Sequence, residues 1–468
     1  MRAGRFDNLF AAAAARPYWW DANPVPAPCP PLAGDADCDL AIVGGGFTGL
    51  WAALIAKERD PDREIVVVES EHVAFGASGR NGGFAEHSLT HGLRNGLARF
   101  GDDELIELER VGAASFAELH AELARHAIDA RYEAGGVLWL ATEPHQLAEI
   151  GEEVELIRRF GGDARALDAA EIRAEVDSPL ALGGVWHRDS GGVLDPVALA
   201  YGLRRAVLAL GVRICERSRV ERMAVEGGRV VLTCPGGSVR ARRVVLATSA
   251  YPPLLRSVQR RMLPVYDYVL VTEPLSPAQR AAIGWANRQG LTDGGNQFHY
   301  FRLTADDRIL YGGYDAIYHW RNGVGPHLDQ RHDTFSLLAG HLLATFPQLE
   351  GIRFTHRWGG AIDTCSRFFA FYGTALGGRV SYAVGYTGLG VGATRFGAEV
   401  ALDLADGRDS PLVRLPIVRE QPRRFPPEPL RSAGVALTRR ELARADRNGG
   451  RRSLYLRALD RMGVGFDS

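Results

Sequence analysis

Leu40–Leu50, which reads LAIVGGGFTGL, is the stretch that decides the fold. The apolar run Asp39–Val43 is followed by three glycines, which is typical of a buried parallel strand that leads into a tight turn. Phe47–Arg59 has helical spacing, and Glu64–Glu69 contains four consecutive aliphatic residues that predict a second buried strand. Strand, helix and strand within about thirty residues form a βαβ unit. The sequence therefore predicts a parallel sheet flanked by helices.

The turn inside this unit matches the dinucleotide-binding pattern G-x-G-x-x-G. Gly44 permits the tight turn, Gly46 lets the backbone approach a pyrophosphate, and Gly49 lets the helix lie close to the strand. The helix N-terminus offers unpaired N–H groups and a positive dipole to the phosphates. Glu69 follows Gly49 by twenty residues, where its carboxylate would accept hydrogen bonds from ribose hydroxyls and disfavour a 2′-phosphate. A dinucleotide other than NADP is predicted.

Two further glycine-rich loops favour FAD over NAD. Gly76–Gly83 (GASGRNGG) directly follows the second strand, and its small residues indicate backbone pressed against something flat. Gly385–Val391 joins the apolar strand Val380–Gly385 to a helix. That junction is a second place where helix N–H groups could face an anionic atom, such as N1/O2 of a reduced flavin. A nicotinamide enzyme needs no such distant second loop.

Composition and charge argue against several other classes of protein. The 468 residues carry 55 basic and 56 acidic side chains, so no basic excess indicates nucleic-acid binding. No apolar stretch reaches the roughly eighteen residues of a membrane span, and Leu9–Ala15 is too short for a signal peptide. Five scattered cysteines without a CxxC pair predict no disulfide framework and no metal site, and favour a reducing, cytoplasmic location.

The whole pattern resembles the D-amino acid oxidase superfamily of FAD-dependent amine oxidoreductases, and within it the gamma-glutamylputrescine oxidoreductase-like branch. The matching segments occur in family order and span nearly the whole chain. They are Pro17–Trp20, Ile42–Leu50, Phe75–Phe84, Asp195–Pro196, Ala247–Tyr251, Tyr300–Gly313, Trp358–Asp363 and Gly385–Val391.

This resemblance implies an α/β (α+β) fold with a Rossmann-like FAD-binding domain built from discontinuous segments and a substrate domain with an antiparallel or mixed sheet. We expect an N-terminal arm over residues 1–38 and a C-terminal extension over 411–468, whose arginines should form a solvated face. The FAD-binding domain is expected to comprise 39–110, 190–260 and 355–410. The substrate domain is expected to comprise 111–189 and 261–354.

The family also implies which residues hold FAD. Relatives that tether FAD use a cysteine or histidine that is absent at the matching places here, since Cys365 falls several residues beyond the position of Gly359 or Gly360. Non-covalent FAD is therefore expected. The implied cofactor residues are Gly44, Gly46, Phe47, Thr48, Gly49, Glu69, Ser70, Ala77, Ser78, Gly79, Arg80, Asn81, Gly82, Gly83, Val220, Thr248, Trp358, Gly360, Gly388, Leu389, Gly390 and Val391.

The implied reaction is oxidation of a C–N bond in a small amine or amino acid. Hydride leaves the carbon beside a neutral amine for flavin N5, and the imine then hydrolyses. Either O₂ or another molecule accepts the electrons. Sarcosine-oxidase-like members place a lysine over the flavin to assist O₂, whereas the only lysine here is Lys57. D-amino acid oxidases carry a carboxylate-binding arginine where this chain has Ala361, and the branch usually has proline at Ala370, which leaves the substrate open.

Four residues are candidates for catalysis: Tyr268, His299, Tyr300 and Arg302. Strand alternation places Tyr300 and Arg302 on one face and His299 on the other. Arg302 could bind a substrate carboxylate with two hydrogen bonds, or form a structural ion pair with Asp306 or Asp307. Tyr268 could contact an amine by cation–π interaction or pack in the core, and His299 could act as a base or be structural.

Two alternatives remain open from the sequence. A flavin monooxygenase, or another flavoenzyme that does not act on amines, would need a second G-x-G-x-x-G or a redox cysteine pair, and neither is found. A non-catalytic flavoprotein subunit is the other alternative, and the complete set of motifs argues against it. The oligomeric state cannot be derived.

Overall fold

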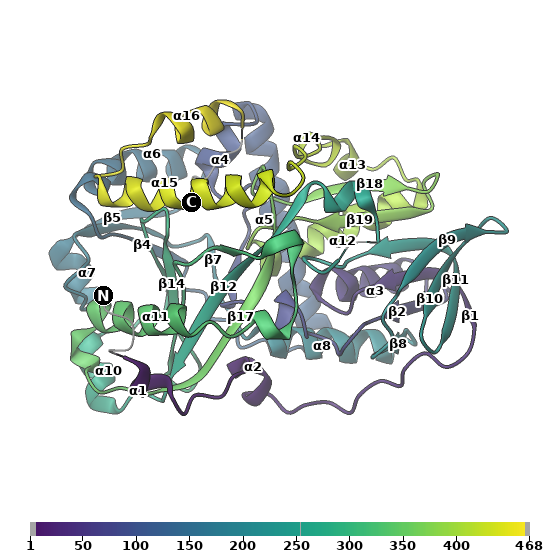
Figure 1. Cartoon of the computed structure of the whole chain (residues 1–468), viewed down its shortest axis with the longest axis horizontal. Coiled ribbons are helices and arrows are strands. Elements are labelled where there is room, and N and C mark those ends of the chain that lie inside the picture. The colour runs from purple at the N-terminus through teal and green to yellow at the C-terminus, as the bar shows by residue number, and fades with distance from the viewer. Residues whose placement is uncertain (1–5, 253, 464–468) are drawn as a thin grey trace.

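Two mixed sheets lie side by side along the longest axis of the molecule (Figure 1). This computed structural model describes residues 6–252 and 254–463, so the predicted arm and extension are described except at their ends, 1–5 and 464–468. No helix in these ranges is long and apolar enough to cross a membrane. The expected fold class, a Rossmann-like unit beside a second mixed sheet, is confirmed.

The first sheet contains the predicted βαβ unit. β1 pairs in parallel with β2 on one side and with β11 on the other, and all its last four residues are buried. β1 begins at Ala36, three residues before the predicted start, because Ala36–Cys38 already pair with β11. The strands are β1 (Ala36–Val43), β2 (Ile65–Val68), β8 (Arg213–Cys215), β9 (Arg222–Glu226), β10 (Arg229–Cys234), β11 (Gly237–Leu246), β18 (Phe371–Ala375) and β19 (Val380–Val384).

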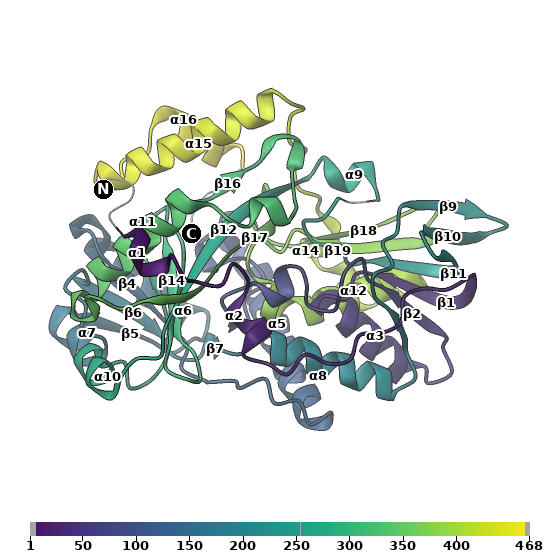
Figure 2. The ribbon, with the colours of Figure 1, turned by 60° about the horizontal axis from the view of Figure 1, so that its bottom comes forward.

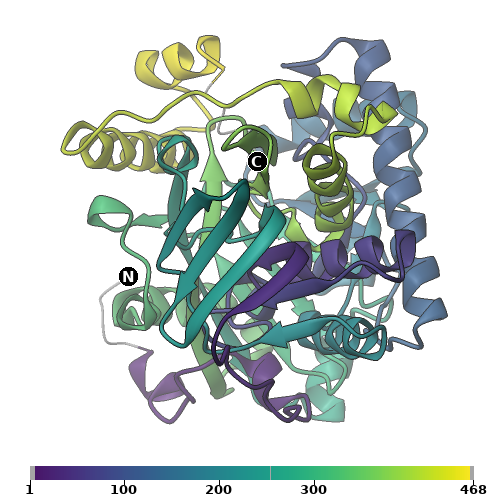
Figure 3. The same cartoon turned by 90° about the vertical axis from the view of Figure 1, so that its right-hand side faces the viewer.

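Helices α3 (Phe47–Arg59), α5 (Asp102–Arg125), α8 (Pro196–Ala209) and α12 (Gly390–Asp406) cover this sheet, with α3 packed between α8 and α12 (Figure 3). Gly49 allows this packing, because a Cβ there would lie 1.9 Å from the carbonyl oxygen of Gly44. α8 begins at Asp195, whose carboxylate accepts from the N–H groups of Val197 and Ala198. α5 packs on α12, so its 111–125 portion, which we expected in the substrate domain, lies against a helix of the first sheet.

The second sheet is built around a long antiparallel pair, β12 (Met262–Thr272) and β17 (Phe354–Cys365). We expected residues 355–365 in the FAD-binding domain, but β17 pairs with β12 over nearly its full length and therefore extends the second sheet. The other strands are β4 (Val137–Ala141), β5 (Ala164–Asp168), β6 (Gly183–His187), β13 (Gly290–Asp293), β14 (His299–Leu303), β15 (Ile309–Gly313) and β16 (Ile317–Tyr318).

Shorter elements join and cover the sheets. α11 packs on β12 and β15, on the face of the second sheet that carries Tyr268. A small two-stranded sheet joins β3 and β7. These elements are α1 (Asp7–Phe10), α2 (Tyr18–Asp21), β3 (Phe84–Glu86), α4 (Leu93–Leu97), α6 (Glu149–Arg159), α7 (Ala169–Glu175), β7 (Gly191–Val193), α9 (Arg256–Gln259), α10 (Pro277–Ile283), α11 (His332–Thr345), α13 (Pro411–Arg414) and α14 (Pro416–Arg419).

The C-terminal extension forms two helices, α15 (Leu430–Arg447) and α16 (Leu454–Arg461), which lie along one side of the second sheet (Figure 2). Polar contacts dock α15: the Asp446 carboxylate accepts from the backbone N–H groups of Asn296 and Gln297. The arginines of this extension do not form a purely solvated face as expected. Arg431 and Arg439, on the side of α15 that turns inward, are half-buried and line the central cavity. Arg423 and Arg424, which precede α15, lie at its edge and are exposed.

Candidate functional site

A cavity of about 1320 Å³ runs between the two sheets. This volume exceeds the ~300–1,000 Å³ of an ordinary small-ligand pocket, which leaves room for a large cofactor together with a substrate. Most of the predicted cofactor residues line it. These are Gly44, Gly46, Phe47, Thr48, Glu69, Ser70, Ala77, Ser78, Arg80, Asn81, Gly82, Val220, Thr248, Gly360, Gly388, Leu389, Gly390 and Val391.

One end of the cavity has the geometry expected for a dinucleotide. Gly44 has φ +114°, and a Cβ on it would lie 2.4 Å from the carbonyl oxygen of Ala247, so only glycine fits there. The N–H of Phe47, at the start of α3, donates to Ser78 Oγ at 2.9 Å. The first turn of α3 therefore faces the cavity, and its N–H groups and dipole suit an anionic group such as a phosphate.

Glu69 lies at the carboxyl end of β2, as predicted. Its Oε2 accepts from the N–H of Gly45 at 2.6 Å, and Oε1 accepts from Ser70 Oγ and from the N–H of Glu71. Burial raises the pKa of Glu69, and these N–H donors oppose that rise. The carboxylate thus orients the glycine turn and still presents lone pairs to the cavity.

Two buried indoles hold the loop Arg80–Gly83. Trp358 on β17 does not line the cavity in the described part of the chain; its Nε1 donates to the carbonyl oxygen of Arg80 at 2.9 Å. Trp19, in the N-terminal arm, donates to the carbonyl oxygen of Asn81. Trp19 was not among the predicted cofactor residues, although the Tyr-Trp-Trp run in an otherwise Ala- and Pro-rich arm was a usable signal.

Arg80 itself is held by protein groups. Its guanidinium lies 2.7 Å from the Asp329 carboxylate and donates to the carbonyl oxygens of Phe75 and Gly359. It therefore ties the loop to β17 and to the segment before α11. Gly79 and Gly83 lie behind the loop: a Cβ on Gly79 would meet the carbonyl oxygen of Ala74 at 1.9 Å, and one on Gly83 would meet that of Leu194 at 2.1 Å.

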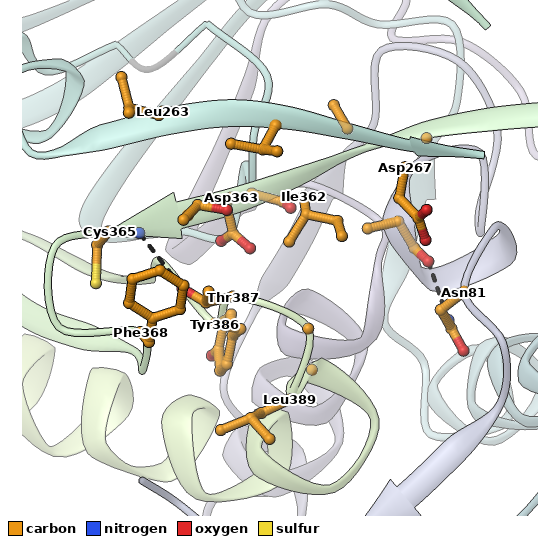
Figure 4. A pocket seen from close by; sticks show the side chains of 18 of the residues that line it. Asn81, Leu263, Asp267, Ile362, Asp363, Cys365, Phe368, Tyr386, Thr387 and Leu389 are labelled. Carbon is orange, nitrogen blue, oxygen red and sulfur yellow. Dashed lines mark hydrogen bonds between the residues drawn. The ribbon is translucent and has the colours of Figure 1, made fainter. Parts of the chain in front are cut away.

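The second predicted loop closes another side of the cavity (Figure 4). Gly388 has φ +97°, and α12 begins after it without a side-chain cap, so the N–H groups of its first turn remain available for an anionic atom. Asp363 on β17 anchors this loop by accepting from the N–H of Gly385 at 2.6 Å. Burial raises the pKa of Asp363 to about 6, and backbone donors oppose the rise.

These features fit FAD. The cavity joins a carboxylate, a helix end and a second helix N-terminus, which suit the adenosine ribose, the diphosphate and the ring of FAD, respectively. Several glycines that line the cavity leave no room for a Cβ. Gly46 is the clearest, because a Cβ there would lie 2.9 Å from Ser78 Oγ.

The structure separates the four catalytic candidates. Tyr300 lines the cavity, and its hydroxyl donates to Asp267 Oδ2 at 2.5 Å. Within the described residues, the other three do not line it. Tyr268 lies on the opposite face of β12, under α11, and donates to the carbonyl oxygen of Leu328. His299 also faces α11, where it contacts Asp293 at 2.6 Å and His341 at 2.8 Å.

Arg302 occupies neither of the environments considered for it. It is 2% exposed and donates to the carbonyl oxygens of Leu194 and Leu303. Its guanidinium stacks on Trp19 at 5.5 Å, behind Gly83. No ion pair of Arg302 with Asp306 or Asp307 is found among the described residues; Asp306 binds Tyr18 and Arg308, and Asp307 binds Arg288. Tight packing under the loop, not contact with a ligand, explains the arginine here.

Sequence reasoning missed Asp267, which lines the cavity beside Tyr300. A carboxylate inside an apolar β-strand was the available signal, because Met262–Thr272 otherwise contains no charged residue. An acidic side chain in such a strand is costly unless it is used or bonded.

Comparison with known proteins identifies the architecture around this cavity. A family model described as FAD dependent oxidoreductase matches residues 39–404. The chain belongs to this family. The resemblance to the D-amino acid oxidase superfamily is thereby confirmed, and the protein is an FAD-dependent oxidoreductase. The matched range ends before α15 and α16, so the helices that close one side of the cavity lie outside it.

Relatives of this FAD dependent oxidoreductase carry related names. Gamma-glutamylputrescine oxidoreductase of Escherichia coli is 33% identical over 385 residues, covering 81% of this chain and 86% of the relative. A probable oxidoreductase OrdL of Haemophilus influenzae is 28% identical over 403 residues, covering 85% and 89%. Among solved structures, glycine oxidase from Geobacillus kaustophilus has a TM-score of 0.68 at 17% identity and covers 82% of this chain and 99% of that one.

Proposed function

We propose that this FAD dependent oxidoreductase oxidises the C–N bond of a small amine or amino acid to an imine, which water then hydrolyses. The observation that carries the proposal is the single cavity in which the two FAD-facing loops meet the inner face of the second sheet. That arrangement leaves a volume beside the cofactor site walled by Tyr300 and β12. FAD, when bound, supplies at N5 the acceptor for the hydride that leaves the carbon beside the amine nitrogen.

The residues of this chain would bind and orient the two reactants. The first turn of α3 and the carboxylate of Glu69 would hold the adenosine diphosphate portion. The N–H groups around Gly388–Val391 would face the electron-rich edge of the ring system, where negative charge develops as it is reduced. The docked helices α15 and α16 would exclude water from the outer side, since their inward residues line the cavity.

Amines are favoured over other donors by the names of the relatives, which include gamma-glutamylputrescine, glycine and sarcosine enzymes. Ala361 supports an amine that lacks a free α-carboxylate, because no arginine stands at this position of β17 and Arg302 lies behind the cofactor loop. We further propose non-covalent FAD, and a reducing cytoplasmic setting in keeping with five buried, unpaired cysteines.

The decisive experiment mixes the purified FAD-loaded protein with individual amines without oxygen. Loss of the flavin absorbance, with formation of an aldehyde or keto acid, would support amine oxidation. Reduction only by NAD(P)H would support a flavin monooxygenase instead. A flavin that no amine and no nicotinamide bleaches would support a non-catalytic flavoprotein. Panels of primary, secondary and carboxylated amines, tested separately, would then narrow the substrate.

A further inference from the structure

Asp267 is a carboxylate that faces the cavity without a cationic partner. It lies in the middle of β12, and its Oδ1 accepts from the N–H groups of Tyr268 and Gly313. Its Oδ2 accepts from the hydroxyl of Tyr300. Among the described residues, no arginine, lysine or histidine forms an ion pair with it. A buried carboxylate held only by neutral donors is an electrostatic site for a cation.

Glycines occupy the strand positions beside Asp267. Tyr300 on β14 reaches Asp267 on β12 across β15, where Gly312 lies between them; a Cβ on Gly312 would be 2.6 Å from the tyrosine oxygen. On the other side of β12, Asp267 pairs with Gly360 of β17. The carboxylate therefore sits in a notch whose neighbouring strand positions carry no side chain of their own, and the Tyr300 ring and the Arg80 side chain pack over them. Asp267 itself lines the cavity, where a small ligand group can reach it.

This notch adjoins the loop that the family uses for its cofactor. A Cβ on Gly82 would lie 2.7 Å from the ring of Tyr300, and a Cβ on Gly360 would lie 3.3 Å from Cβ of Arg80. Asp267 and Asn81 are seen together in Figure 4, away from Cys365 and Phe368. The carboxylate therefore lies in the cavity beside the loop that carries Asn81 and Gly82.

We propose that Asp267 binds the substrate's ammonium group and takes one of its protons, with Tyr300 as the residue that positions the carboxylate. The inference rests on the proposed amine oxidation. An alkyl amine is an ammonium ion at neutral pH, with a pKa near ~10 like that of lysine. Only the neutral amine has the lone pair that assists departure of the hydride. The balance is one proton from nitrogen to Asp267, giving a carboxylic acid, and one hydride from carbon to oxidised FAD, giving the protonated imine.

The protonation state of Asp267 suits this role. Burial raises its pKa to about 6, opposed by the Tyr300 hydroxyl, by the two N–H donors and by the charge of His299 on the far face of the sheet. From β17 it faces only Gly360, and the nearest cation on the cofactor loop, Arg80, is paired with Asp329. Above about pH 6 the carboxylate is charged and can bind an ammonium ion; below it the neutral acid cannot accept a proton.

Asp267→Asn tests the proposal with two readouts. The amide oxygen can still accept from Tyr268 and Gly313, so the strand should keep its geometry. The first readout needs no turnover: the visible spectrum of the bound flavin is titrated with choline and with its uncharged isostere, 3,3-dimethyl-1-butanol. The wild-type protein should bind choline at least about tenfold more tightly, as expected for a charge-assisted contact. Asp267→Asn should lose that preference.

The second readout is the pH profile of flavin reduction by an amine without oxygen, measured as the rate constant over Kd. For the wild-type protein, the rate constant over Kd should rise through about pH 6, stay constant, and fall near the pKa of the amine. The reason is that productive binding requires both the charged carboxylate and the charged ammonium ion. Asp267→Asn should have no step near pH 6 and should rise until the amine itself is neutral. Tyr300→Phe removes a bond that lowers the pKa of Asp267, so its acid step should move to higher pH.

Matched controls separate the possible failures. Asp163→Asn removes the same charge from a side chain that is 62% exposed and outside the cavity, and it should leave both readouts unchanged. FAD content and melting temperature check the fold of each variant. Wild-type choline preference and pH profile in Asp267→Asn would overturn the proposal. If no amine reduces wild-type flavin, the proposed function fails, while the choline titration still decides whether Asp267 is a cation site.

Discussion

Trp19 donates a hydrogen bond from its indole Nε1 to the carbonyl oxygen of Asn81 at 2.8 Å, and so joins the N-terminal arm to the cofactor loop. Trp19→Phe keeps most of the packing but leaves a buried carbonyl without its donor. We expect FAD affinity to fall by about 5- to 30-fold, corresponding to ~1–2 kcal/mol. Fluorescence titration of apoprotein with FAD measures this. Trp320→Phe, at a side chain 56% exposed, is the control, and equal affinities of the two variants would contradict the anchoring role.

Glu69 should contribute to FAD binding both directly and through the glycine turn. Glu69→Ala removes the ribose-facing carboxylate and the acceptor for the N–H of Gly45. We expect FAD affinity to weaken by about ten- to a hundredfold, or ~1.5–3 kcal/mol, without unfolding of the chain. Glu69→Gln keeps one acceptor oxygen and should lose less. Unchanged affinity in the alanine variant would mean that neither a ribose contact nor the orientation of the turn by Glu69 contributes to FAD binding.

FAD should leave the protein on acid precipitation and colour the supernatant. Cys365 lines the cavity, but its Sγ is buried and donates to the carbonyl oxygen of Phe369 at 3.1 Å. Burial also raises the pKa of this thiol, which disfavours the reactive thiolate. A yellow pellet would contradict non-covalent binding. Repeating the test with Cys365→Ser would then show whether this cysteine is the tether.

Arg302→Lys should change stability and leave substrate affinity unchanged. The guanidinium supplies hydrogen bonds to two buried carbonyls, those of Leu194 and Leu303, and lysine cannot reproduce their geometry. The unfolding free energy should fall by about 1–3 kcal/mol. The KM for an amine, measured per FAD bound, should stay within about twofold, since Arg302 lies behind Gly83. A large rise of KM for carboxylated amines alone would restore the substrate-clamp hypothesis.

Local signals made the cofactor half predictable. The signals for this half lie close together in the sequence: the glycine spacing around Gly44, the strand before it and Glu69 after it. Each of them depends only on short-range structure. The second sheet was harder, because β17 and β12 pair across roughly ninety residues and no local pattern fixes that register. The boundary expected at residue 355 therefore separates β17 from the strand with which it pairs.

Strand alternation predicted which residues of β14 share a face of the strand, but not which of them reach the cavity. It placed Tyr300 and Arg302 on one side of β14 correctly, yet only Tyr300 reaches the cavity, since Gly83 and Leu194 cover Arg302. Asp267 gains its importance from Gly312 and Tyr300 on other strands, which a single strand's sequence does not reveal.

Oxygen should be a poor electron acceptor for this protein. Electron transfer to O₂ first forms an anion, which a fixed positive charge beside the reduced ring would stabilise. The only lysine, Lys57, lies in the last turn of α3 and donates to the carbonyl oxygen of Arg63, outside the cavity. His299 and Arg302, the substitutes suggested by the sequence, face away from the cavity as well. Arg80 does line it, but the carboxylate of Asp329 offsets its charge, and the cavity arginines Arg423, Arg424, Arg431 and Arg439 belong to the C-terminal extension and not to the two glycine loops.

Stopped-flow mixing tests this expectation. Enzyme reduced by an amine without oxygen is mixed with aerated buffer, and separately with a quinone or dye. A single preorganised charge is worth about 10²–10³ in rate, so reoxidation by O₂ should be slower than reoxidation by the artificial acceptor by a factor of that order. The comparison uses one preparation of reduced protein, so differences in FAD content cancel. Rapid reoxidation by O₂ with stoichiometric peroxide would show that another group supplies the charge, and Asp329→Asn, which would leave Arg80 unpaired, would then be expected to accelerate it further.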